Sequence, residues 1–176
     1  MTALTLTLIG RDRPGLVGAL SERIAAAGGN WLEGRMARLA GQFAGVLLVE
    51  VPAAEADRLV EALRGLGSEG LRVTVEPGVN EALAPAARHG LTLELVGQDR
   101  PGIVREVAQA LAERGVNIEE LTTQVATASF SGERLFRATA RLQAPAGAHL
   151  GDLRDVLEAL AHELMVDIDL EEAEAG

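Results

Sequence analysis

The chain of 176 residues contains one segment twice. Residues 4–17 (LTLTLIGRDRPGLV) return as residues 91–104 (LTLELVGQDRPGIV), and the match continues without a gap as far as Gly28, Asn30 and Glu33, which correspond to Gly115, Asn117 and Glu120. The repeat predicts two copies of one module of roughly 80 to 90 residues rather than a single domain. Modules of this size bury thin cores, so we expect each to pack against the other copy or another chain.

Each copy begins with a strand pattern and continues with a helix pattern. Leu4, Leu6 and Leu8 alternate with threonines, which is the period of a strand with one buried face. A turn of the form Gly-x-Asp-Arg-Pro-Gly follows in both copies, and we expect its proline at the first helical position. Each helix is expected to end at a glycine, Gly28 or Gly115, where a left-handed residue is favoured.

The remainder of each copy predicts a hairpin, a second helix and a closing strand. The hairpin strands are expected over 30–40 and 42–51 in the first copy, and over 117–128 and 133–142 in the second. Leucines at helical spacing follow, and the closing strands are expected over 71–75 and 165–170. This βαββαβ order predicts an α+β, ferredoxin-like module, with a four-stranded antiparallel sheet and two helices on one face.

The domain boundaries follow from the same pattern. We expect a first domain over 1–77, a linker over 78–89, a second domain over 90–171 and an acidic tail over 172–176.

The composition excludes several classes of function. Apolar residues make up 48% and charged residues 24%, as in folded globular proteins. No apolar run approaches the roughly 20 residues of a bilayer span, so we expect a cytoplasmic protein that does not enter a membrane. No cysteines are present and the three histidines stand at no ligand spacing, so we expect no metal and no cofactor. The net charge of −10 repels phosphate, which argues against direct nucleic-acid binding.

The two copies differ in the second strand of the hairpin. Residues 46–49 (VLLV) are apolar on both faces, whereas residues 136–142 (FRATARL) alternate, with arginines expected to face outward. A strand that is apolar on both faces calls for cover on both, which makes the helix-free face of the first sheet a candidate interface, within a homo-oligomer. The strand propensity of valine and leucine explains the same residues equally well.

The repeated turn is the best candidate for a binding site. A helix N-terminus carries unpaired N–H groups and a partial positive charge, which favour an anion. Gly15 lets a ligand approach the backbone, Arg13 supplies a cation, and Asp12 caps the helix or accepts from an ammonium group. Asn30 is expected near this turn, so a small zwitterion fits here and at the matching residues Asp99, Arg100, Gly102 and Asn117.

A purely structural role for the same turn is an open alternative. Asp-x-Pro-Gly before a helix is ordinary turn and capping chemistry, and a duplicated fold duplicates its turns. Catalysis has less support, because the serines lack a nucleophile elbow, no histidine stands in the turn and no Gly-Lys-Ser phosphate loop is present. We therefore expect a protein that is not an enzyme.

The strand, the turn, the Gly-x-Asn that ends the helix and the hairpin together resemble the ACT domain, an amino-acid-sensing regulatory module. The resemblance covers nearly the whole chain, as two ACT domains in tandem. Residues 35–49 and 130–136 resemble in addition the glycine cleavage system transcriptional repressor family, whose members are such tandem pairs. This resemblance implies a regulator without a DNA-binding domain, which antagonises a LysR-type transcriptional activator and responds to glycine.

The resemblance to ACT domains also implies the ligand-binding positions, which are Asp12, Arg13, Gly15, Leu16 and Asn30 in the first copy and Asp99, Arg100, Gly102, Ile103 and Asn117 in the second. Trp31 stands where an aliphatic residue such as Ile118 is more usual, and we expect it to fill or reshape the first site. The second copy is therefore expected to be the better ligand seat.

Two alternative functions stay open from the sequence. In the first, the chain is a ligand-independent protein-interaction module. In the second, it is a detached regulatory subunit of an amino-acid or one-carbon metabolic enzyme. The second alternative arises because similar Asp-Arg-Pro-Gly modules head formyltetrahydrofolate deformylases.

Overall fold

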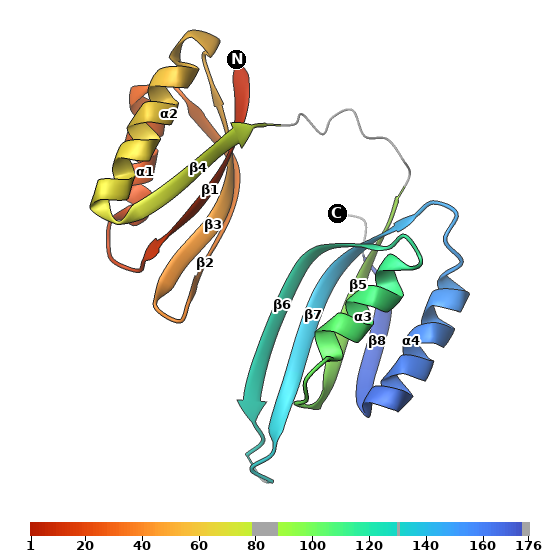
Figure 1. The fold of residues 1–176 in the computed structure, drawn as a ribbon. Coiled ribbons are helices and arrows are strands. Elements are labelled where there is room, and N and C mark those ends of the chain that lie inside the picture. Colours follow the sequence, from red (N-terminus) through yellow and green to blue (C-terminus); the bar gives the residue numbers. More distant parts are fainter. Residues whose placement is uncertain (79–87, 130, 174–176) are drawn as a thin grey trace. The chain divides into compact units, whose positions relative to one another are not determined.

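A computed structural model describes residues 1–78, 88–129 and 131–173 (Figure 1). The chain divides into two compact units, Met1–Ala84 and Pro85–Gly176. The first contains β1 (Thr2–Arg11), α1 (Leu16–Ala26), β2 (Asn30–Leu39), β3 (Gln42–Val51), α2 (Ala56–Gly65) and β4 (Leu71–Pro77), with short 3₁₀ turns at Ala53–Glu55 and Leu66–Glu69. The second contains β5 (Arg88–Gln98), α3 (Ile103–Ala112), β6 (Asn117–Thr127), β7 (Arg134–Pro145), α4 (Leu150–Leu164) and β8 (Val166–Glu172).

Each unit is built on one antiparallel sheet of four strands. The strand order is β2-β3-β1-β4 in the first unit and β6-β7-β5-β8 in the second. Figure 1 shows α1 and α2 together on one face of the first sheet, and α3 and α4 together on one face of the second. The predicted fold, two tandem βαββαβ modules, is confirmed.

The alternating pattern of the sequence forms the core of each module. In the middle of each central strand, β1 and β5, three alternate residues are buried leucines that face the helices, and α1 and α3 bury one residue per turn against them. These core residues are Leu4, Leu6, Leu8, Leu16, Leu20 and Ile24 in the first module and Leu91, Leu93, Leu95, Ile103, Val107 and Leu111 in the second. Each module therefore has a core made from its own residues.

The linker predicted over 78–89 falls mostly on 79–87, which lie outside the described residues. At its far end the structure differs from the prediction, because Arg88 and His89 already pair with β7 at the start of β5. Glu172, assigned to the tail, pairs with Leu91 and ends β8. The second module is therefore slightly longer than the range 90–171 predicted from hydrophobic alternation, because strand pairing continues beyond the alternating residues at both ends.

The closing strand of the second module begins one residue later than predicted. Met165 has a left-handed backbone (φ 53) and is the residue that ends α4. Its side chain is exposed, so its apolar character did not signal a place in the strand.

Candidate functional site

The repeated turn joins β1 to α1 and β5 to α3, and its glycines rather than its prolines set the helix starts. Gly15 (φ 91, ψ −3) and Gly102 (φ 100, ψ −13) are left-handed and immediately precede the helices. Their dihedral angles are those of the third residue of a type II turn, in which proline is common at the second position. The prediction that Pro14 and Pro101 open the helices is therefore wrong, since each proline sets the turn before its helix.

The aspartates of the turn bind the hairpin tip instead of capping the helices. Asp12 Oδ2 lies 2.8 Å from Arg38 Nε, and its backbone N–H donates to the carbonyl of Gly41 at 2.9 Å. Asp99 Oδ2 lies 2.9 Å from Arg134 Nη2, and its N–H donates to the carbonyl of Arg134 at 2.9 Å. Neither helix has a side-chain cap, so a capping role for Asp12 is excluded. The two modules make this ion pair with arginines from different strands, β2 and β7.

We expect the Asp12–Arg38 ion pair to contribute little to stability. The side chains are 35% and 69% exposed, and pairs of this kind contribute about 0 to 1 kcal/mol. A double-mutant cycle with Asp12→Ala and Arg38→Ala, followed by chemical denaturation, measures the coupling directly. A coupling above about 2 kcal/mol would contradict the assignment of this pair as a solvent-screened contact.

The arginines of the two turns are in different states. Arg13 Nη2 donates to the carbonyl oxygen of Glu69 at 2.7 Å, which ties Arg13 to the end of the 3₁₀ turn that precedes β4. The Nε of Arg100 is buried and has no hydrogen-bond partner within the described residues. A buried donor without an acceptor lowers the stability of the folded protein by about 1 to 3 kcal/mol. A ligand that supplies an acceptor to this group would remove that cost on binding. Arg100 of the second module is therefore available to a ligand, whereas Arg13 of the first module is bonded to the backbone of its own module.

The first turn of α3 places a glutamate beside the repeated turn of the second module. Glu106, in the first turn of α3, places Oε1 at 3.2 Å from the position of a Cβ on Gly102, and it also lies 3.5 Å from Arg105 Nη2. Ala19 stands at the matching position of α1, and nothing lies within 4 Å of a Cβ on Gly15. A zwitterion needs both a cation and an anion, and in the second module the carboxylate of Glu106 supplies an anion beside the turn in addition to Asp99.

The asparagines do not lie near the turns. Asn30 pairs with Glu50, which pairs with Ala3 at the beginning of β1, whereas the turn follows Arg11 at its end. The eight residue steps between Ala3 and Arg11 span about 27 Å. The expectation that Asn30 joins the turn in one site is therefore wrong, and the register of Asn117 repeats the result. The cause is α1, which runs back across the sheet before β2 begins.

Trp31 fills core space in the first module rather than the turn. Its Nε1 lies 3.4 Å from the position of a Cβ on Gly34, and that position is also 3.3 Å from Leu47 Cδ1. The indole is partly buried against the core, from the edge strand β2. The prediction that Trp31 reshapes the ligand seat finds no support in these contacts.

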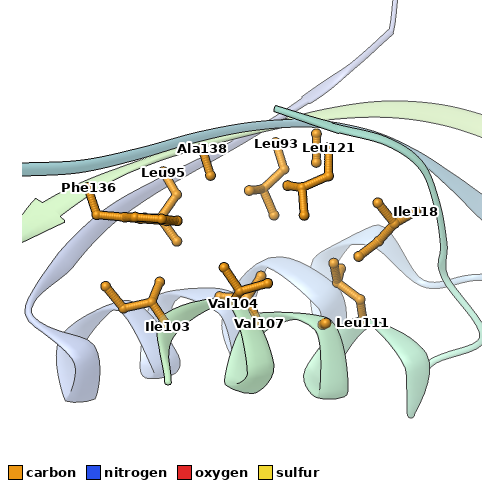
Figure 2. A pocket seen from close by; sticks show the side chains of 12 residues that line it. Leu93, Leu95, Ile103, Val104, Val107, Leu111, Ile118, Leu121, Phe136 and Ala138 are labelled. Carbon is orange, nitrogen blue, oxygen red and sulfur yellow. The ribbon is translucent and has the colours of Figure 1, made fainter. Parts of the chain in front are cut away.

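A hollow in the second module was not anticipated from the sequence. Figure 2 shows it between α3, which contributes Ile103, Val104, Val107 and Leu111, and the sheet, from which Leu121 and Phe136 point toward the helix. All twelve residues that line it are apolar, and its volume is about 30 Å³. The signal in the sequence is the pair of small residues Ala138 and Ala140 on β7.

The helix-free face of the first sheet is apolar at its centre. Ile9 and Val46 are 42% and 50% exposed there, and they line a shallow hollow with Ala44, Thr7 and Arg72. The corresponding face of the second sheet carries Arg137 and Arg141 on β7. The first module leaves this face uncovered by its own elements, and its use as an interface stays a prediction.

The fold and the repeated turn define a tandem pair of ferredoxin-like modules. Residues 2–76 and residues 91–161 each match a family model of the ACT domain. The chain belongs to the ACT domain family and consists of two ACT domains in tandem.

Three comparisons with known proteins extend this assignment. The crystal structure of a protein of unknown function from Galdieria sulphuraria is 31% identical, with a TM-score of 0.86 over 98% of both chains. A protein provisionally described as a glycine cleavage system transcriptional repressor is 20% identical, with a TM-score of 0.71 over 99% of this chain and 98% of that one, and shares the fold. A UPF0237 protein of Methanopyrus kandleri is 34% identical over 74 residues, which are 42% of this chain and 77% of that protein.

The ACT family indicates a regulatory role based on amino-acid sensing. Within residues 1–78, 88–129 and 131–173, no three histidine, aspartate or glutamate side chains cluster closely enough to hold a metal ion. In that same part of the chain, no helix combines the length and apolar character needed to cross a bilayer.

Proposed function

We propose that this chain is a non-enzymatic regulator that senses a small amino acid, with glycine favoured. In this proposal it controls transcription of the glycine cleavage system through contact with a LysR-type transcriptional activator. The tandem ACT architecture supports the sensing role, and the fold shared with a protein described as a glycine cleavage repressor supports the biological setting.

The observation that carries the sensing role is the Nε of Arg100, which is buried and has no hydrogen-bond partner within the described residues. An α-amino acid presents a carboxylate, which pairs with a guanidinium through charge-assisted hydrogen bonds. The ammonium group of the same ligand finds an acceptor in the carboxylate of Glu106, which lies over Gly102. The backbone N–H groups at the start of α3 add to the attraction for the ligand's carboxylate. We therefore assign the seat to the second module.

Action through a protein partner agrees with the charge of the chain. A net charge of −10 repels the phosphate backbone of DNA, so a transcriptional effect requires an intermediary protein. The apolar helix-free face of the first module, around Ile9 and Val46, is our candidate for this contact. In this proposal the second module binds the ligand and the first module contacts the partner.

The sensing role predicts a saturable rise in melting temperature with a small amino acid. Stabilisation of about 2.7 kcal/mol is expected when the ligand stands at a hundredfold excess over its dissociation constant. For a module of this size, 1 kcal/mol corresponds to roughly 4 to 8 °C. Differential scanning fluorimetry with glycine, alanine and serine measures the shift, and an unchanged melting temperature with every amino acid would favour a ligand-independent interaction module.

Two matched substitutions locate the seat. Arg100→Gln removes the guanidinium with the unsatisfied Nε and is expected to abolish the glycine-induced shift, because the ligand carboxylate loses its cation. Arg13→Gln removes the matching arginine that is bonded to Glu69, and the glycine-induced shift is expected to persist. If Arg13→Gln alone removed the response, the seat would belong to the first module.

Partner identity is tested by co-purification with the full chain. Capture of a helix-turn-helix activator, lost in Val46→Arg and kept in Arg137→Ala on the helix-free face of the other module, supports the proposal. Capture of a metabolic enzyme instead would identify the chain as a detached regulatory subunit.

A further inference from the structure

We propose that the hollow between α3 and the β6–β7 side of the second module binds the unbranched aliphatic end of a small molecule. This ligand class differs from the zwitterion of the proposed function, because no charged or hydrogen-bonding side chain lines the hollow. An ammonium or carboxylate group placed there would lose its hydration without gaining a partner.

The size of the hollow limits what it can hold. A cavity needs about 10 to 15 Å³ to accommodate one water-sized group. The volume of about 30 Å³ therefore has room for roughly two to three such groups, which is the end of an alkyl chain rather than a ring system. Water gains no hydrogen bonds from the apolar wall, so an alkyl group is the better occupant.

The hollow is open at one side, where a chain can enter. Val104 on α3 and Leu121 on β6 both line it and are 42% and 43% exposed. Figure 2 shows the side chains of Val104 and Leu121 pointing into the space between helix and sheet. An entering chain leaves its polar end in solvent between these two residues.

In the first module, side chains of the protein occupy the position that corresponds to the hollow. By strand register, Gly45 and Leu47 of β3 correspond to Ala138 and Ala140 of β7. The unbranched side chain of Met36 packs over Gly45, and Trp31 packs beside Leu47.

The second module has no counterpart of the Met36 side chain, and Ile118 takes the place of Trp31. Thr123 pairs with Ala138 as Met36 pairs with Gly45, and Thr123 is exposed. Within β6, Ile118 packs against the core of its module and Leu121 lines the hollow, but neither side chain fills the space over Ala138. The hollow is thus the place of a missing methionine-like chain, which is the chemistry that we assign to the ligand.

A homologous series of alcohols from methanol to 1-hexanol tests the proposal on the full chain. Methyl NMR shifts of Leu121 and Val104 are expected to saturate, with a dissociation constant that falls about fourfold per added methylene over the first steps. The gain is expected to flatten once two to three carbons are inside. The absence of saturable shifts, or shifts spread evenly over both modules, would overturn the proposal.

Three substitutions make the test specific. Thr123→Met restores the filler of the first module at an exposed position and is expected to weaken hexanol binding at least tenfold. Ala140→Leu restores Leu47 and is expected to do the same from inside the core. Thr122→Met adds the same side chain on the helix-free face and is expected to leave binding unchanged. Equal hexanol binding in all three variants would overturn the assignment, whatever the outcome with glycine.

Discussion

Leu6→Ala is expected to destabilise the first module by about 3 to 5 kcal/mol. Leu6 lies on the central strand β1, is fully buried and belongs to a core that Trp31 and Met36 help to fill. Truncation leaves a cavity that this filled core cannot close without moving several side chains. The matched change Leu93→Ala is expected to cost less, because Leu93 already borders the hollow of the second module and gives up fewer contacts.

Calorimetry of the full chain separates the two effects. Each core is made from residues of one module, so Leu6→Ala should lower one thermal transition, by roughly 10 °C or more, and leave the other in place. A single transition that moves as a whole in both variants would contradict independent cores.

Gly10→Ala is expected to cost about 3 kcal/mol or more in the first module. A Cβ at this position would overlap the carbonyl oxygen of Gly70 and lie 3.2 Å from the Cα of Leu71. Both obstacles are backbone atoms, so they cannot rotate away, and the pairing of β1 with β4 must shift. The control Gly18→Ala lies inside α1 with nothing within 4 Å, and it is expected to stabilise the module by about 0.5 to 1 kcal/mol.

The same variant separates stability from sensing. Because the proposed seat lies around Arg100 and Gly102, glycine should still raise the melting transition of the second module in Gly10→Ala. Titration with glycine during differential scanning calorimetry measures this response. A response lost together with the first module would mean that ligand binding depends on both modules.

The sequence predicted the positions of the two turns of the candidate site, but not the contacts that their side chains make. The repeated Gly-x-Asp-Arg-Pro-Gly predicted two turns before two helices, and both are present. The ion pairs of Asp12 with Arg38 and of Asp99 with Arg134 were not predictable, since the two arginines occupy unrelated positions in the repeat. Asn30 follows the helix closely in sequence, yet α1 carries it to the other end of the sheet.

Local patterns were sufficient for the fold of this protein. Alternation in Leu4, Leu6 and Leu8, helical spacing in Leu16, Leu20 and Ile24, and a second copy of both determine two βαββαβ modules, because strand and helix periods are properties of neighbouring residues. The tertiary structure alone decided which arginine stays unpartnered and where the second core stays unfilled. Both outcomes depend on contacts between side chains from elements that are distant in the sequence, and the periodicity of neighbouring residues does not predict such contacts.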